Sequence, residues 1–391
     1  MHPNKVDREM ENFSLLAGDL AKGASSWDSR PTTLELSFNN LCNLRCRMCA
    51  KADREKNALM DKAVARRALA ELLPYALHWT PSANSEPLLN DMQEVHDLCR
   101  EHIVWLLLFT NATILTKERF LAIRERTHRL FISFDSHVKE TFELLRTGAD
   151  YEEVLANIRA VIPLAKEDAT EVTFNVVLMR QNLTTLPEYV HFVAGLGADG
   201  IHVQELLPNS SYFADLVIDT LPEKLVAERI EAARAAARER KIDLFLDIRP
   251  PYQVADVYNR RDWSKAPLAS MREQFSTAVA TLYPHFCPMA NHYVKVNPSG
   301  AVFPCCRAPA ELEMGNLYTQ SFEEIWNGER YRTFRQRMFA RDYPESCKSC
   351  YILTGNPAFQ SLLGRERHGL TAPPASATPL PAAPGSRAPG S

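Results

Sequence analysis

The chain has 391 residues, of which 46% are hydrophobic and 24% are charged, and its formal net charge is −3. This length and apolar content predict about two domains with a substantial core, which excludes a small disulfide-stapled peptide and a disordered chain. The nearly balanced charge gives no electrostatic reason to expect nucleic acid as a partner.

Six short apolar segments predict β-strands in the first part of the chain. They lie at 34–39, 76–82, 103–109, 129–135, 171–179 and 200–206, and segments with helical spacing lie between them. Strands that alternate with helices indicate βαβ units and a parallel sheet. The expected fold class is therefore α/β, with a partial (βα)6 barrel of the TIM type. In such folds the functional groups gather at the C-terminal ends of the strands.

The rest of the chain predicts a smaller C-terminal domain. Before it, a proline-initiated, alanine-rich helix at 222–241 and a strand at 242–248 belong to the expected barrel. In the small domain itself, a turn at 297–300 between two apolar runs predicts a β-hairpin, and a helix is expected near 321–339. The segment 371–391 is rich in proline and alanine and carries a single charge, which predicts a disordered tail. The expected segments are an N-terminal extension (1–31), the barrel (32–248), a bridging region (249–285), the small domain (286–355), a C-terminal extension (356–370) and the tail (371–391).

The N-terminus is too polar for a secretion signal, and the sequence lacks an apolar run long enough to cross a bilayer. We therefore expect a cytoplasmic protein without a membrane span. In a reducing cytosol, nine cysteines are more consistent with metal binding than with disulfides.

Three of these cysteines, Cys42, Cys46 and Cys49, directly follow the first predicted strand. Structural zinc sites need four ligands and usually come as two separated CxxC pairs. Three thiolates on a cubane iron–sulfur cluster instead leave one iron open to an exogenous ligand. An open site of this kind indicates chemistry rather than scaffolding.

The spacing Cys-x3-Cys-x2-Cys, placed after the first strand of a (βα)6 pattern, resembles the radical S-adenosylmethionine (radical SAM) superfamily. The resemblance implies a 4Fe–4S cluster whose open iron binds S-adenosylmethionine, and an external reductant such as flavodoxin or ferredoxin. Reductive cleavage then yields a 5′-deoxyadenosyl radical that abstracts a hydrogen atom from the substrate. Met48 stands where many members carry an aromatic residue, and methionine is adaptable enough to line the same adenine pocket.

The resemblance extends to four further residues and implies that they bind the cofactor. Glu86, in SANSEP, stands where the family has a Gly-Gly-Glu-Pro segment that contacts the methionine amino group, and Asn111 lies in a Thr-Asn-Ala segment that resembles Thr-Asn-Gly. Ser133 and Arg146 stand where related enzymes contact the ribose and the carboxylate. The structural alternatives are a helix cap for Glu86, a turn for Asn111, and turn or surface positions for Ser133 and Arg146.

Four cysteines of the small domain, Cys287, Cys305, Cys347 and Cys350, can complete a site around either zinc or a cubane cluster. The pattern Cys-x12-Gly-x4-Cys before a final CxxC resembles the SPASM and shorter twitch extensions of radical SAM enzymes. That resemblance implies one auxiliary 4Fe–4S cluster, because no cysteine follows Cys350.

Two cysteines remain. Cys306 packs as a small hydrophobic residue, replaces Cys305 as a ligand, or donates a hydrogen atom to a substrate radical, and the sequence leaves these three alternatives open. Cys99, inside a predicted helix, is expected to be a core residue.

Residues on the later strands are candidates to line the substrate cavity. Asn175 and Met179 share one face of the fifth strand, and His202 and Gln204 share one face of the sixth. Arg180 and Glu205 lie near the strand ends. For each of them alone, a hydrogen-bonded barrel residue is favoured over a catalytic one.

The resemblance leads us to expect an oxidoreductase or epimerase that dehydrogenates or epimerises a small molecule such as a sugar or an aminocyclitol. The alternative is a maturase that modifies a ribosomally synthesised peptide, and we rank it second because the segment before the first strand is too short for a peptide-binding domain. A non-catalytic iron–sulfur or zinc protein is the alternative from another class.

Overall fold

The computed structural model describes residues 3–49, 57–82, 84–206, 213–248, 252, 254–256, 258, 267–348, 350 and 353. The predicted C-terminal extension and tail lie outside the described residues. The chain forms two compact units. Unit 1 comprises Met1–Glu35, Asp61–His78 and Ala266–Ser391, and unit 2 comprises Leu36–Met60 and Trp79–Lys265. Strands β1 (Thr33–Leu36) and β2 (His78–Thr80) are divided between the units.

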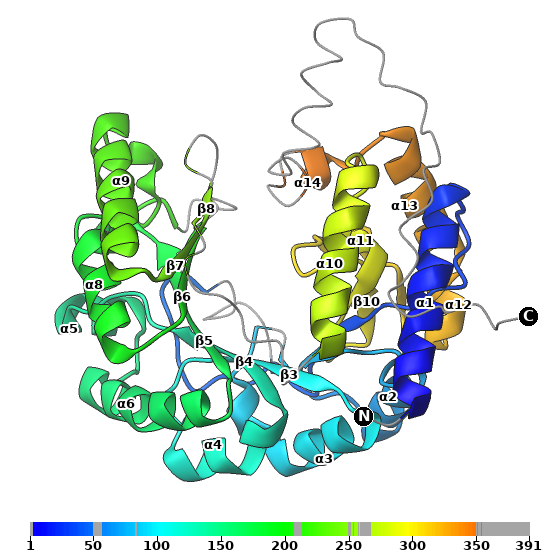
Figure 1. Ribbon diagram of the computed structural model, residues 1–391, viewed down its shortest axis with the longest axis horizontal. Helices are drawn as coiled ribbons and strands as arrows, with labels where there is room; N and C mark the ends of the chain where they lie inside the picture. Colours follow the sequence, from blue (N-terminus) through cyan, green and yellow to red (C-terminus); the bar gives the residue numbers. More distant parts are fainter. Residues whose placement is uncertain are drawn as a thin grey trace, which may run out of the picture. The chain divides into compact units, whose positions relative to one another are not determined.

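Unit 2 is built on a parallel sheet, which confirms the expected α/β class (Figure 1). After β2 the strands are in the order β3 (Trp105–Thr110), β4 (Thr127–Ser133), β5 (Glu171–Leu178), β6 (Gly200–Glu205) and β7 (Asp243–Asp247), with β8 (Val254–Asp256) antiparallel at the edge. The longer helices between them are α3 (Met92–His102), α4 (Lys117–Ile123), α5 (Lys139–Leu145), α6 (Tyr151–Glu167), α8 (Leu186–Leu196) and α9 (Glu223–Arg240), and the shorter ones are η1 (Pro87–Leu89), η2 (Arg124–Arg126), α7 (Arg180–Leu183) and η4 (Ile218–Thr220). The predicted strands and the predicted helix at 222–241 are therefore confirmed.

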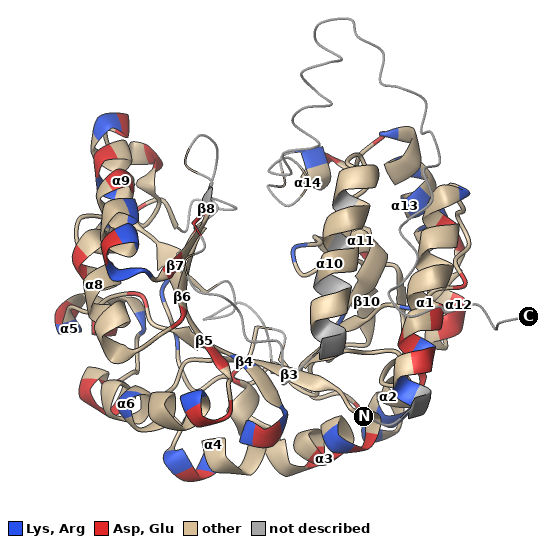
Figure 2. Cartoon of the chain, in the orientation of Figure 1, with Lys and Arg blue, Asp and Glu red and all other residues tan. Residues whose placement is uncertain are grey.

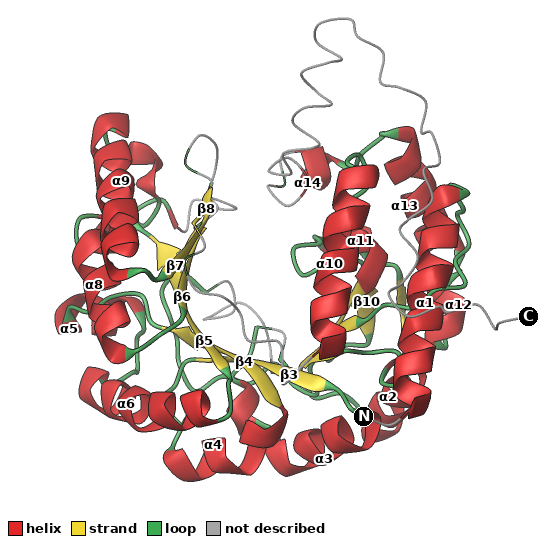
Figure 3. Ribbon diagram, viewed as in Figure 1, coloured by secondary structure: helices red, strands yellow, loops and turns green. Residues whose placement is uncertain are grey.

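The two faces of this sheet differ. Helices cover one face of the sheet (Figure 3). On β5, Val172, Phe174, Val176 and Leu178 are fully buried, whereas on the opposite face, called the inner face below, Thr173 is buried and Glu171, Asn175 and Val177 are half-buried. Side chains alternate between faces along a strand, so the period-two pattern of the sequence separates a core face from a face available to ligands.

The charges of helix α9 form a solvated face. Figure 2 shows Lys and Arg interspersed with Asp and Glu along it, and Arg234 and Arg238 both pair with Glu231. Its buried side is formed by Val226, Ile230 and three alanines, so the helix is amphipathic and its charges carry no binding signal.

Unit 1 holds the predicted hairpin, with strand order β11 (Gly315–Asn316), β10 (Ala301–Phe303), β9 (Tyr293–Val296) and β1. Its helices are α1 (Pro3–Ala21), α2 (Lys62–Leu72), α10 (Pro267–Leu282), α11 (Pro288–His292), η5 (Ala310–Leu312), α12 (Phe322–Trp326), α13 (Glu329–Ala340) and α14 (Glu345–Lys348). The turn between β9 and β10 ends at Gly300, whose φ of +81° favours glycine.

The helix predicted near 321–339 is two helices. Ser321 begins α12 with a capping box to Glu324, and the chain breaks before Gly328, which begins α13. A Cβ at Gly328 would lie 2.6 Å from the carbonyl oxygen of Glu324, so the close approach of the two helices requires glycine.

The N-terminal extension belongs to the fold of unit 1. Phe13 of α1 stacks on Phe275 of α10 with ring centroids 5.1 Å apart. Lys5 donates to the carbonyls of Pro74 and Ala76 at 3.1 and 2.8 Å and pairs with the buried Glu9 at 3.1 Å. The Lys5 ammonium group therefore provides hydrogen bonds to backbone carbonyls in the segment that follows α2.

A buried arginine joins the N-terminal segment to α13. The Arg335 guanidinium lies 4.3 Å from the Trp27 ring centroid and 4.4 Å from that of Trp326, and it donates to the carbonyl of Ser25. A cation between two indoles is favourable when it is desolvated. Among the described residues, no helix has the length and apolar character needed to cross a membrane.

Candidate functional site

The cysteine loop after β1 is fixed to unit 2 by backbone hydrogen bonds. The amides of Arg45 and Arg47 donate to the carbonyls of Thr147 and Leu145 at 3.0 and 2.9 Å. These carbonyls lie at the end of α5 and just after it, so the loop that carries the three thiols is bonded to the segment that carries Arg146.

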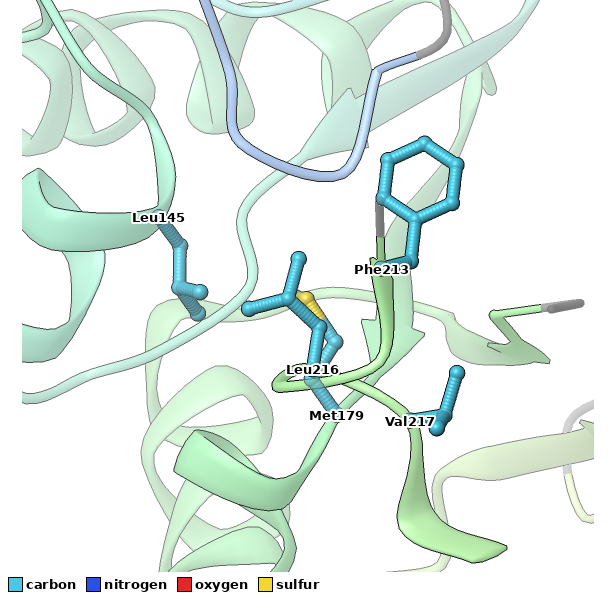
Figure 4. Packing of buried hydrophobic residues seen from close by; sticks show 5 residues of the cluster. All are labelled: Leu145, Met179, Phe213, Leu216 and Val217. Carbon is cyan, nitrogen blue, oxygen red and sulfur yellow. The ribbon is translucent and has the colours of Figure 1, made fainter. Parts of the chain in front are cut away.

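An apolar cluster lies against the same loop. It comprises Leu145, Met179, Phe213, Leu216 and Val217, all buried, and Met48 packs against it (Figure 4). Met179 is therefore a core residue, and the expectation that it lines the substrate cavity with Asn175 is wrong. The reason is that β5 ends at Leu178 and the chain turns into α7, which ends the period-two alternation.

The three thiols differ in exposure but interact electrostatically. Cys42 is exposed, Cys49 is half-buried and Cys46 is buried. Burial raises the pKa of Cys46 to about 11, and the neighbouring Cys42 and Cys49 contribute to the rise. Binding to iron requires the thiolate, so cluster assembly releases these protons.

This donor set fits a cubane cluster better than a single ion. Cys42, Cys46 and Cys49 are three thiols, one fewer than the four ligands that a structural zinc ion takes. A cubane takes each thiolate through a different iron, so its ligands surround a cluster and do not meet at a point. Three neighbouring thiols on one loop match that requirement.

Arg146 lies between Asp135 and Cys46. Its Nε is 2.8 Å from Asp135 Oδ2, and its Nη1 is 4.0 Å from Cys46 Sγ. Asp135 also accepts a hydrogen bond from the amide of Val177 at 2.8 Å. Burial raises the pKa of Asp135, and the guanidinium opposes that rise. A positive charge beside a sulfur stabilises the thiolate that a cluster needs.

Glu86 is buried and fully hydrogen-bonded. Its carboxylate accepts from the Asn111 amide at 2.7 Å, from Thr110 Oγ1 at 2.8 Å and from the Leu88 amide at 3.2 Å. It caps η1, as the structural alternative expected. Burial raises the pKa of Glu86 to about 7, and these hydrogen bonds oppose the rise. The carboxylate therefore connects the segment after β2 to the end of β3.

Asn111 connects the end of β3 to the cysteine loop. Its Oδ1 accepts from Thr113, and its Nδ2 donates to Asn43 Oδ1 at 2.9 Å and lies 3.9 Å from Cys42 Sγ. Ala112 adopts φ of +61°, the left-handed conformation that favours glycine. Asn111 thus occupies the turn that was its structural alternative. Its side-chain amide nevertheless lies beside the thiol of Cys42.

Strand register places three of the candidate residues in one row on the inner face of the sheet. Ser133 on β4 pairs with Asn175 on β5, which pairs with His202 on β6. Sequence reasoning missed Asp247 on β7, whose Oδ2 lies 3.2 Å from His202 Nε2. Nothing in the local pattern connects two residues 45 positions apart, so only the tertiary fold reveals the pair.

Electrostatic interactions divide the five cysteines of the small domain into a group of four and a single residue. Cys305 interacts electrostatically with Cys287, Cys347 and Cys350. Burial raises the pKa of the neighbouring Cys306 to about 12, and its largest electrostatic partner is Glu35, followed by Cys305, whereas no interaction with Cys287, Cys347 or Cys350 contributes to that rise. Four grouped thiols suit an auxiliary cubane cluster, and the structure therefore favours Cys305 over Cys306 as its fourth ligand.

Comparison with known families agrees with this arrangement. Residues 36–193 match the radical SAM superfamily, and residues 287–351 match the SPASM family, described as an iron–sulfur cluster-binding domain. The chain belongs to the radical SAM superfamily. It is a member with a C-terminal SPASM-type domain, and its cofactors are S-adenosylmethionine and 4Fe–4S clusters.

Two curated relatives align over most of their length. A tungsten-containing aldehyde ferredoxin oxidoreductase cofactor-modifying protein of Pyrococcus furiosus is 27% identical over 339 residues, which cover 82% of this chain and 87% of the relative. A PqqA peptide cyclase of Bradyrhizobium diazoefficiens is 25% identical over 337 residues, covering 82% of this chain and 78% of the relative.

Solved structures share the fold. Streptococcus suis SuiB bound to the precursor peptide SuiA gives a TM-score of 0.59 at 15% identity, covering 86% of this chain and 72% of SuiB. The enzyme anSMEcpe with bound AdoMet gives 0.55 at 15% identity, covering 83% and 84%.

Proposed function

We propose that this radical SAM enzyme modifies a peptide substrate. The observation that carries the proposal is the alignment with PqqA peptide cyclase, which extends over 82% of this chain. This changes the order of the sequence-based expectations, in which a small molecule ranked first. When bound, S-adenosylmethionine on the reduced cluster supplies a 5′-deoxyadenosyl radical for hydrogen abstraction.

In this proposal, Cys42, Cys46 and Cys49 hold the cluster, and the Arg146 guanidinium balances negative charge beside the second thiolate. The geometry that supports it is the contact of Arg146 with both Cys46 and Asp135.

Three neighbours of the thiols complete the proposed cofactor site. Glu86 and Asn111 hold the segments around the cysteine loop through their hydrogen bonds, and Ser133 lies at the end of β4 on the inner face. An external reductant such as flavodoxin or ferredoxin supplies the electron.

In the small domain, Cys287, Cys305, Cys347 and Cys350 hold the auxiliary cluster. Cys306 stands outside this proposed ligand set, and hydrogen donation to a substrate radical is the role that we propose to test for it. Replacing Cys306 with serine leaves the cluster ligands intact and tests that role separately.

Modification of a small molecule is the second candidate function. The relative from Pyrococcus furiosus, which aligns over 87% of its length, is named as a cofactor-modifying protein. For this second candidate function, the reaction to test is the dehydrogenation or epimerisation of a small metabolite.

The test is co-expression of the chain with each short open reading frame that neighbours its gene, followed by mass spectrometry of the encoded peptides. We expect one peptide to change mass with wild type and not with Cys46→Ser, whereas Cys99→Ser, at a buried position away from the site, retains the change. Unchanged peptides together with an altered small metabolite would favour the second candidate.

A further inference from the structure

His202 and Asp247 form a hydrogen-bonded pair on the inner face of unit 2 that no step of the proposed cofactor binding uses. The Nε2 to Oδ2 distance is 3.2 Å, and the side chains are 25% and 12% exposed. The two residues come from neighbouring parallel strands, β6 and β7. A rigid sheet therefore fixes their separation.

The pair orients the imidazole for chemistry at its other nitrogen. When Asp247 accepts a hydrogen bond from Nε2–H, the proton is held on Nε2 and Nδ1 keeps its lone pair. The contact with Asp247 uses Nε2 and leaves Nδ1 of His202 outside it. A carboxylate that orients a histidine in this way also stabilises the imidazolium formed when the free nitrogen takes up a proton.

A second observation on the same row points to a ligand. The Oδ1 of Asn175, the register neighbour of His202, is buried and has no hydrogen-bond partner among the described residues. A buried acceptor without a donor costs about 1–3 kcal/mol, which a bound group can recover. Asn175 and His202 are register partners on the adjacent strands β5 and β6. Neighbouring acceptor atoms on one face suit a substrate with N–H donors, such as a peptide amide.

We propose that His202 is a catalytic residue that accepts a proton from the substrate, with Asp247 as its positioning residue. This rests on the proposed function, because the donor is an N–H or O–H of a peptide bound over the inner face. The substrate N–H or O–H bond breaks, its electron pair stays on nitrogen or oxygen, and an Nδ1–H bond forms on His202. Asp247 then faces the imidazolium across the same Nε2 to Oδ2 contact.

The first experiment needs no substrate. Anaerobic holoenzyme is treated with diethyl pyrocarbonate, which carbethoxylates accessible unprotonated imidazole nitrogens, and each histidine is followed by mass spectrometry. His202 should react at least about tenfold faster than the buried His96, and Asp247→Asn should slow it at least about threefold. An unreactive His202, or a rate unaffected by Asp247→Asn, overturns the assignment.

The second experiment uses the co-expressed peptide whose mass changes with wild type. His202→Gln should reduce modified peptide per 5′-deoxyadenosine by about 100-fold or more, and His191→Gln, at an exposed position on α8, should leave it within about threefold. Retained modification by His202→Gln overturns the proposal. If wild type modifies no peptide, the proposed function fails, and the carbethoxylation rates still decide whether His202 is an accessible, oriented base.

Discussion

The pair between Arg146 and Asp135 should be the most sensitive point of unit 2. Their side chains are 9% and 0% exposed, and the Nε to Oδ2 distance is 2.8 Å. Arg146→Met leaves the Asp135 carboxylate buried without its counter-charge. Removing one partner of a buried pair costs about 3–5 kcal/mol. Since each kcal/mol lowers the melting temperature of a domain of this size by about 2–4 °C, we expect a fall of about 6 to 20 °C.

The assay is anaerobic scanning calorimetry, with an exposed pair as the matched control. Arg124 lies 3.1 Å from both Glu167 and Asp168, and the three side chains are 30%, 62% and 26% exposed, so Arg124→Met should cost less than about 1 kcal/mol. Asp135→Asn combined with Arg146→Met removes the uncompensated charge and should recover at least half of the loss. A loss below about 1 kcal/mol for Arg146→Met, equal to that of the control, would refute the reasoning.

Three further predictions concern unit 1. Burial raises the pKa of Glu9 to about 7, so native Glu9 holds its proton more tightly than the unfolded chain, and its contribution to stability falls as pH rises from 4.5 to 7. In denaturant titrations the stability of Glu9→Gln relative to wild type should therefore rise by about 2.5 kcal/mol between pH 5 and pH 8, and a constant difference would contradict this. Cys305→Ser should lose about four irons while Cys306→Ser keeps them, measured by iron analysis after anaerobic reconstitution, and the opposite result would make Cys306 the ligand. Arg335→Lys loses the planar group between two indoles and should lower the unfolding free energy by about 2 kcal/mol in urea, whereas an unchanged midpoint would show that charge alone suffices.

Local sequence patterns are sufficient to predict the strands of the parallel sheet and the two sets of cysteines. Alternation along β5 predicts its buried face because side chains of a strand point to opposite sides, and the spacing of Cys42, Cys46 and Cys49 predicts one shared centre because all three lie on one short loop. These features depend only on near neighbours in the sequence.

Features that depend on tertiary contacts are not predictable in this way. The N-terminal extension gives no sign that its Trp27 will meet Arg335, and Asp247 gives no sign that it will meet His202. The choice between Cys305 and Cys306 depends on which adjacent side chain points to the other thiols. The resemblance places Arg146 near the cofactor, but its pairing with Asp135 requires the buried end of β4 to be known.

The central claim is tested most directly by anaerobic reconstitution followed by reduction in the presence of S-adenosylmethionine. Wild type should bind about eight irons, as two cubane clusters require, and release 5′-deoxyadenosine, while Cys46→Ser should release none. Stoichiometric zinc in place of iron, with no 5′-deoxyadenosine from wild type, would contradict the account.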